Sequence, residues 1–188
     1  MENKNLQDSI PVLPTDEKTT ASDPAAPWVC PDFKVAGIFS SHMVLQRETP
    51  IKIWGFSQAV GSRVAGCFMG ETVTATVGED NRWLLTFSAH LYECEPQIMV
   101  VSDDLGHTVT FEDILVGDVW LIGGQSNAEL NLSACISLTP SIDFYEGDNF
   151  RLFSQARQYV AEHQELCSAP QPDIINSDWS WKRPDREA

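Results

Sequence analysis

The chain has 188 residues and a mass of 20.9 kDa, with 43% hydrophobic residues, 10% aromatic residues and a formal net charge of −15. This length fits one ordinary domain, or a small domain with part of another, and the composition is that of a globular protein. Acidic residues occur along the whole chain and Lys and Arg form no cluster, so neither nucleic acid nor an acidic membrane surface is expected as a partner.

The first 31 residues are predicted to be a disordered leader. They lack hydrophobic periodicity and are rich in Pro, Asp, Glu, Ser and Thr, a composition that buries too little apolar surface to offset chain entropy. No apolar segment typical of a secretory signal follows Met1, and no stretch reaches the length of a membrane span. A cytoplasmic location is therefore the default expectation.

Residues 32–113 are predicted to form an antiparallel β-sandwich of about 80 residues. Short apolar runs alternate with turn residues, and no amphipathic helix interrupts them. Trp54 and Trp83 are expected in the core rather than as sugar-binding platforms, because large aromatic residues contribute heavily to small cores. The predicted strands are residues 35–39, 43–46, 51–55, 63–69, 72–77, 83–87, 97–101 and 107–111.

A second domain is predicted over residues 114–188. Residues 114–122 are nearly all apolar, which is typical of a strand buried on both faces in a parallel α/β sheet. A helix is expected over 127–138 and another strand over 150–160. The inward stripe of that helix would be Ala128, Leu132, Cys135 and Ile136.

This second domain is expected to be truncated. A parallel α/β layer needs several strands covered by helices, and residues 114–188 supply too few. We therefore expect apolar surface from Leu121, Ile122, Leu152 and Phe153 to be exposed.

The cysteines indicate no metal site and no disulfide framework. They are scattered, odd in number and lack a Cys-x-x-Cys pair. They are Cys30, Cys67, Cys94, Cys135 and Cys167.

The most chemically suggestive residue is Ser126, which lies at a predicted turn from strand to helix. A serine there is exposed near free helix N–H groups that stabilise negative charge, and the backbone N–H groups of Gly124 and Ser126 are candidate oxyanion donors. A serine nucleophile also needs a base, usually a histidine held by a carboxylate. The alternative is an ordinary turn in which Asn127 caps the helix.

Several stretches together resemble the sialate O-acetylesterase family in order and spacing. They are Met-Val-Leu-Gln-Arg at 43–47, Ile-Trp-Gly at 53–55, Asn-Arg-Trp at 81–83, Val-Gly-Asp-Val-Trp-Leu at 116–121 and Gly-Gln-Ser-Asn at 124–127. Asn-Phe-Arg-Leu-Phe at 149–153 and the region of Trp179 look like the family's next segments. The resemblance covers residues 33 to about 181.

The resemblance implies a β-rich N-terminal domain followed by an SGNH-type α/β hydrolase domain. Such a protein would hydrolyse acetyl esters on sialic acids or related acetylated sugars, without a metal or cofactor. Ser126 matches the family's nucleophile, with its own N–H as one oxyanion donor, while Gly124, Gln125 and Asn127 match the residues that shape the turn. The family's usual Met after this Asn is Ala128 here.

The family's base has no counterpart in this sequence. Its Asp-x-x-His unit and two further oxyanion donors lie beyond the point where the chain stops. The one Asp-x-x-His match, Asp104 to His107, precedes the serine at a predicted hairpin turn and is expected to be turn chemistry. His42, His90 and His163 have no such partner in sequence and are expected to be surface or structural residues.

Two functions follow as expectations. The first is a carbohydrate O-acetylesterase that is nearly inactive alone, with a second polypeptide carrying the Asp-x-x-His half as a candidate partner. The second is a non-catalytic β-sandwich module that binds glycans or partners. The residues do not specify which sugar is used, and members of this family can be secreted.

Overall fold

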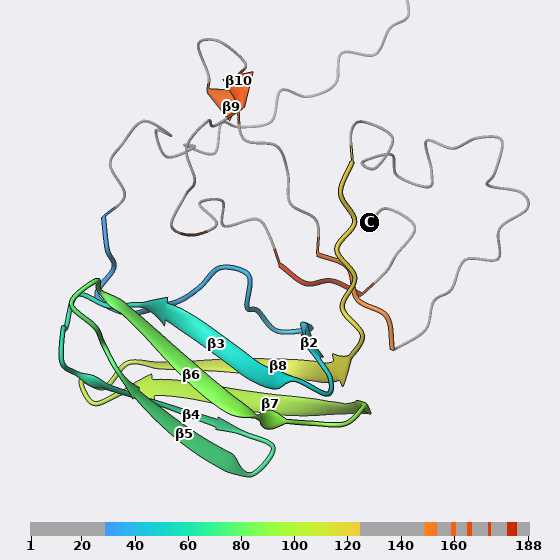
Figure 1. The fold of residues 1–188 in the computed structure, drawn as a ribbon, viewed down its shortest axis with the longest axis horizontal. Helices are drawn as coiled ribbons and strands as arrows, with labels where there is room; N and C mark the ends of the chain where they lie inside the picture. Colours follow the sequence, from blue (N-terminus) through green and yellow to red (C-terminus); the bar gives the residue numbers. More distant parts are fainter. Residues whose placement is uncertain are drawn as a thin grey trace, which may run out of the picture.

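The computed structural model describes residues 29–124, 149–153, 159–160, 165–166, 173 and 180–183, and all regular elements among them are strands (Figure 1). The predictions made for residues 1–28 and 125–148 lie outside these residues. The strands are β1 (Lys34–Val35), β2 (Val44–Gln46), β3 (Pro50–Phe56), β4 (Arg63–Phe68), β5 (Glu71–Thr76), β6 (Arg82–Ala89), β7 (Glu93–Asp103), β8 (Thr108–Gly117), β9 (Tyr159–Val160) and β10 (Glu165–Leu166).

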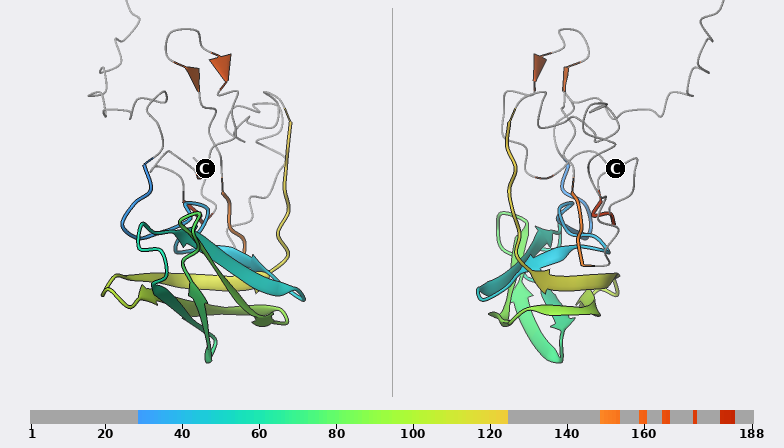
Figure 2. Two further views of the ribbon diagram at one scale, coloured as in Figure 1. Left: turned by 60° about the vertical axis from the view of Figure 1, so that its left-hand side comes forward. Right: turned by 90° about the vertical axis from the view of Figure 1, so that its right-hand side faces the viewer.

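Two sheets face each other across one hydrophobic core (Figures 1 and 2). The smaller sheet has the order β1-β3-β6 and the larger sheet has the order β2-β8-β7-β4-β5. Neighbouring strands pair antiparallel in both sheets, except that β2 and β8 run parallel. The short strands β9 and β10 form a separate antiparallel pair.

The core follows from the alternation of apolar and polar residues along the strands. In β3 and β6 every second side chain is buried over most of the strand, as a pleated strand with one face on a core requires. The two sheets touch closely at Gly66 of β4, where an added Cβ would lie 2.7 Å from Leu85 Cδ1 and 2.8 Å from Phe87 Cζ of β6. The largest fully buried side chains include Trp83, Phe56, Phe68, Phe87, Met43, Ile53, Leu85 and Met99.

The structure confirms that this part of the chain is built from strands, and it separates the two tryptophans. Trp83 is 2% exposed and belongs to the core, as predicted. Trp54 is 40% exposed, so its assignment to the core is wrong. Trp54 is paired with the half-exposed Leu84 across the β3–β6 ladder, and the pleat directs its neighbour Ile53 inward instead.

The predicted strand over residues 114–122 is also wrong in its extent and in its sheet. Residues 114–117 are the buried end of β8, a strand of the larger sheet of the β domain. Residues 118–124 form no strand, and Trp120, Leu121 and Ile122 are 84%, 99% and 81% exposed. The run is apolar because the end of β8 lies between β7 and the parallel strand β2 over the core, where burial removes the alternation.

The described parts of the second predicted domain contain no helix and little regular structure. Among the described residues of the predicted strand over 150–160, Leu152 makes an isolated bridge with Lys182 and residues 159–160 form the short strand β9. Leu121 and Ile122 are exposed as expected, whereas Leu152 and Phe153 are partly buried. Within the described ranges no helix is long and apolar enough to cross a membrane.

Candidate functional site

The segment leading to Ser126 leaves the β domain at the end of β8. Gly124 is the last described residue of this segment, and Gln125, Ser126 and Asn127 lie outside the described residues. The path up to Gly124 is exposed and extends away from the two sheets (Figure 1). The predicted nucleophile and its turn therefore stay a prediction.

The start of this segment is held by the last residue of β2, Gln46, and by the next residue, Arg47. Gln46 Oε1 accepts a hydrogen bond of 2.9 Å from the backbone N–H of Val119, and Arg47 Nε donates one of 2.9 Å to Asp118. The hydrogen bond from Arg47, reinforced by its charge, holds the pKa of Asp118 below its ordinary value. Two stretches that carry the family resemblance, 43–47 and 116–121, are thus in direct contact.

A second set of polar groups converges on Asp113 of β8. His42 Nδ1 lies 2.6 Å from its Oδ2, Arg151 Nη2 lies 3.0 Å from Oδ1, and Arg183 Nη2 lies 3.1 Å from Oδ2. Burial raises the pKa of Asp113, but the hydrogen bonds from His42 and Arg183 and the charges of both arginines outweigh it, so the pKa lies below its ordinary value.

Sequence reasoning missed this cluster because its members are far apart in the chain. His42 and Arg183 are about 70 residues from Asp113, and Arg151 is 38 residues away. One local feature is unusual: both His42 and Asp113 have a positive φ, 68° and 55°. No sequence pattern marks that conformation at either residue.

The Asp-x-x-His match at 104–107 is structural in this fold, with a different carboxylate. His107 Nδ1 lies 2.7 Å from Oδ2 of Asp103, whose side chain is fully buried. The imidazole also stacks on Phe33, with ring centroids 5.6 Å apart, and Phe33 in turn stacks on Trp83 at 5.7 Å. This geometry fits the predicted turn chemistry of the β7–β8 hairpin.

The other histidines contribute no described carboxylate pair. The ring of His90 packs edge-on against Phe68 in the β domain, with centroids 5.9 Å apart. His163 lies outside the described residues. Among the residues that the structure describes, no group of three or more His, Cys, Asp and Glu side chains could hold a metal ion.

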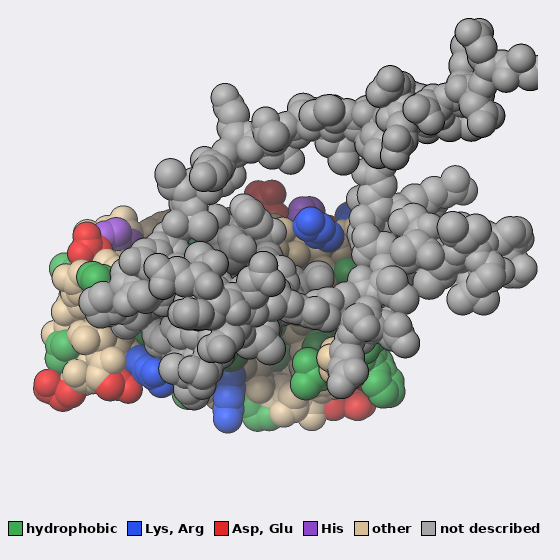
Figure 3. All heavy atoms as spheres, turned by 90° about the horizontal axis from the view of Figure 1, so that it is seen from above, with side chains coloured by type: hydrophobic (Ala, Val, Ile, Leu, Met, Phe, Trp, Pro, Cys, Tyr) green, Lys and Arg blue, Asp and Glu red, His purple; other side chains and the backbone are tan. Residues whose placement is uncertain are grey.

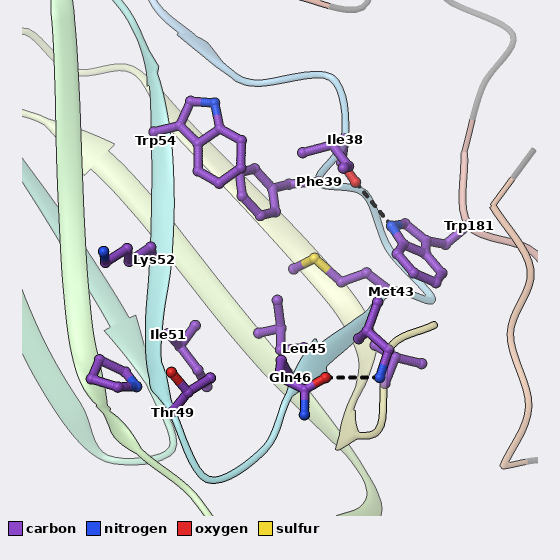
Figure 4. Close-up of a pocket in the computed structure, with 13 residues that line it drawn as sticks. Ile38, Phe39, Met43, Leu45, Gln46, Thr49, Ile51, Lys52, Trp54 and Trp181 are labelled. Atoms are coloured by element: carbon purple, nitrogen blue, oxygen red, sulfur yellow. Dashed lines mark hydrogen bonds between the residues drawn. The ribbon is translucent and has the colours of Figure 1, made fainter. Parts of the chain in front are cut away.

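A mainly apolar groove of about 260 Å³ lies at the β2–β3 side of the domain (Figure 4). Phe39 meets Trp54 edge-on there, with centroids 4.6 Å apart, and Trp181 Nε1 donates a 2.9 Å hydrogen bond to the carbonyl oxygen of Ile38. Lys52 also lines the groove. In Figure 3 the visible Lys and Arg side chains lie at separate places among other residue types and form no continuous patch.

Comparisons with known proteins show that this chain is similar to esterases. The chain is 29% identical to the sialate O-acetylesterase of Rattus norvegicus over 163 residues, and 24% identical to that of Homo sapiens over 164 residues. These matches cover 81% and 82% of this chain, but 28% and 30% of the relatives. The chain thus spans less than a third of the relatives' length, and no family model matches it.

A solved structure agrees with this relationship. The crystal structure of a carbohydrate acetylesterase from Xanthomonas citri aligns with a TM-score of 0.60 and 25% identity, over 80% of this chain and 32% of that one. The matched length of about 160 residues in the curated relatives reaches beyond the two sheets, so the likeness is not confined to the β domain.

Proposed function

We propose, on the premise that this chain belongs to the sialate O-acetylesterase family, that it is the part of a carbohydrate O-acetylesterase that supplies the serine nucleophile, Ser126. The observation that carries the proposal is the contact between two motif stretches. Gln46 and Arg47 hold Asp118 and Val119, which begin the segment that continues to Ser126.

The proposed chemistry is acyl transfer through an acetyl-serine. Ser126 Oγ attacks the acetyl carbonyl carbon while a base takes its proton, and the N–H groups of Ser126 and Gly124 bind the resulting oxyanion. The sugar oxygen leaves with a proton, and water then hydrolyses the acetyl-serine to acetate and free serine. Gln125 and Asn127 are proposed to shape the turn that presents these groups.

The base is proposed to come from outside this sequence. Neither described His–Asp pair has the chain position of the family's base: both His42 and His107 precede the serine. Removing the base from a serine triad leaves only residual catalysis from the oxyanion donors and from binding. An Asp-x-x-His unit outside this sequence is therefore the proposed base, and an O-acetylated sialic acid is the first substrate to test, because the relatives are sialate O-acetylesterases.

Covalent labelling of Ser126 by a fluorophosphonate tests this proposal. The chain is labelled alone and after mixing with the Asp-x-x-His part of a relative, with Ser126→Ala as the matched control. We expect labelling and acetate release in the mixture, both abolished in Ser126→Ala, and little of either with the chain alone. No labelling in either sample contradicts the proposal, and fast acetate release by the chain alone contradicts the need for a partner.

A second candidate function is glycan binding by the β domain, which the position of Trp54 favours. Trp54 is 40% exposed and meets Phe39 edge-on in a mainly apolar groove, a combination that suits the apolar face of a sugar ring. Titration of the chain with an acetylated sialoside, followed by tryptophan fluorescence, tests this function. Binding lost in Trp54→Ala and retained in Ser126→Ala supports it, and no saturable binding contradicts it.

A further inference from the structure

The stretch at 149–153 has no role in the proposed chemistry, yet the structure gives its arginine a defined environment. The side chain of Arg151 is fully buried, and its Nη2 lies 3.0 Å and 3.1 Å from the two carboxylate oxygens of Asp113. A charged side chain is buried in proteins almost only when it is paired. Asp113 is thus the described carboxylate that compensates Arg151.

The later segment at 180–183 is fastened at the same place. Arg183 Nη2 lies 3.1 Å from Asp113 Oδ2, and the backbone of Lys182 exchanges two hydrogen bonds of 2.8 Å with Leu152. Trp181 adds a hydrogen bond of 3.0 Å from its N–H to the hydroxyl of Ser40. The two segments therefore contact each other and share one carboxylate of the β domain.

The backbone of β8 is irregular at the residue that makes these contacts. Gln97 of β7 pairs with Ile114 and Met99 pairs with Phe111, so β8 carries an extra residue between these two pairs. Asp113 lies in this bulge with a φ of 55°. Bulges of this kind redirect a side chain out of the regular ladder and occur often beside functional sites.

The position of Asp113 in the chain links these contacts to Ser126. Asp113 lies shortly before the end of β8, and Arg151 lies 38 residues after it, so the Asp113–Arg151 contact closes a loop of chain that contains Ser126. The N-terminal side of this loop is also held, because Gln46 and Arg47 bind residues 119 and 118. Both ends of the loop are thus attached to the same sheet of the β domain.

We propose that Asp113 is a positioning residue that fastens residues 149–153 and 180–183 to the β domain and thereby holds the two ends of the loop that carries Ser126. The part of this inference that concerns reactivity rests on the proposed function, whereas the fastening itself does not. Arg151 is the main partner, because its side chain is buried, and Arg183 and His42, which are about half exposed, contribute less.

The fastening is tested by trypsin and by hydrogen exchange on Asp113→Asn in the full chain. Removing the charge weakens the contact between Asp113 and the buried Arg151, so the segment should open more often and cleavage after Arg151 should become at least about tenfold faster. The amides of Leu152 and Lys182 should lose protection by a similar factor. The matched control is Asp103→Asn, which removes another buried, histidine-bound carboxylate that contacts neither segment.

The outcome is decided by the difference between the two variants. Opening of both segments in Asp113→Asn but not in Asp103→Asn supports the proposal, and equal opening in both, or in neither, overturns it. Should Asp113→Asn fail to fold, Arg151→Met replaces it, with protection of the Lys182 amide as the readout. Arg151→Met should act more strongly than Arg183→Met, and the reverse order also overturns the proposal.

The consequence for Ser126 is measured separately by fluorophosphonate labelling in the mixture described above. Asp113→Asn should lower the maximal labelling rate at least about tenfold, with a smaller change in the concentration that gives half of this rate. Asp113→Glu, which keeps the charge, should restore part of it. Unchanged labelling in Asp113→Asn overturns the positioning role, while absence of labelling in the unmodified chain contradicts the proposed function and leaves the fastening to be decided by proteolysis and exchange.

Discussion

Two aspartate–histidine pairs illustrate how the same two residue types serve different ends in this protein. The side chain of Asp103 is fully buried and holds His107 within the β7–β8 hairpin, where the imidazole stacks on Phe33. Asp113 is 13% exposed and joins His42 to two arginines from later segments. Each carboxylate also accepts hydrogen bonds from groups other than its histidine.

The Asp103 pair predicts a specific dependence of stability on pH. Burial raises the pKa of Asp103, but hydrogen bonds from the His107 side chain and from the N–H groups of His107 and Leu105 outweigh it, so the folded pKa lies below the ordinary value. A depressed carboxyl pKa contributes stability above the unfolded pKa of about 3.9, and this stability is lost as pH falls through the folded pKa.

We therefore expect Asp103→Asn to lower the free energy of unfolding by about 1 to 3 kcal/mol at neutral pH and to flatten its decline below pH about 4. Urea unfolding of the full chain at a series of pH values measures both effects. Glu79→Gln is the control, since this exposed carboxylate lies in the turn before β6 and makes no described ion pair. Parallel pH profiles for the unmodified chain and Asp103→Asn would show that the pair does not contribute in this way.

At the scale of elements, the smaller sheet depends on a close approach at Gly55. This residue of β3 pairs with Val35 of β1 on one side and with Trp83 of β6 on the other. A Cβ there would collide with the carbonyl oxygen of Lys34 and would lie 2.7 Å from Cε2 of the Trp83 indole. Glycine allows the short strand β1 and the large indole to occupy adjacent space.

We expect Gly55→Ala to destabilise the chain by about 1 to 3 kcal/mol, because the added methyl group overpacks the sheet against backbone and a buried indole. Gly117→Ala in β8 is the matched control, since its Cβ would meet Val44 Cγ1 at an ordinary distance of 3.5 Å. Thermal and urea unfolding, together with near-ultraviolet circular dichroism of the aromatic residues, measure the difference. Equal stability of the two variants contradicts the packing argument.

At the scale of the whole molecule, the β domain is well packed but its exit segment presents apolar side chains to solvent. Trp120, Leu121 and Ile122 are 84%, 99% and 81% exposed, directly after the buried end of β8. Contiguous exposed apolar residues of this kind mark surfaces that associate with other protein or with another part of the same assembly. Association in a molecule of net charge −15 must also overcome electrostatic repulsion, so added salt should promote it.

We expect the double substitution Leu121→Ser and Ile122→Ser to weaken self-association about tenfold or more, since each removed side chain carries an apolar transfer free energy of about 1.5 to 3 kcal/mol. Sedimentation velocity over a concentration series and fluorescence of a hydrophobic dye provide the measurements. Leu105→Ser is the control, because Leu105 is 61% exposed at an isolated hairpin tip. An equal effect of the control assigns association to general surface hydrophobicity instead.

The sequence by itself determined the features that depend on neighbouring residues. The period-two alternation in stretches such as 51–55 and 83–87 located the strands, because pleating places successive side chains on opposite faces whatever the rest of the chain does. The motif stretches likewise indicated the family, since they are local strings of residues. Ser126 is indicated by its place in the local string Gly-Gln-Ser-Asn and by that resemblance, and it stays a prediction.

Only the tertiary structure decided features that depend on distant parts of the chain. Trp54 faces outward because the alternation along β3 puts Ile53 on the core. The apolar run at 114–117 lies in the larger sheet because β8 pairs with β7 on one side and with β2 on the other. Asp113 binds Arg151, which lies 38 residues later in the chain. Asp113 lies in a bulge of β8 that no local sequence pattern predicts. Such contacts arise from the way the strands are brought together, and this arrangement cannot be read from the spacing of residues along the sequence.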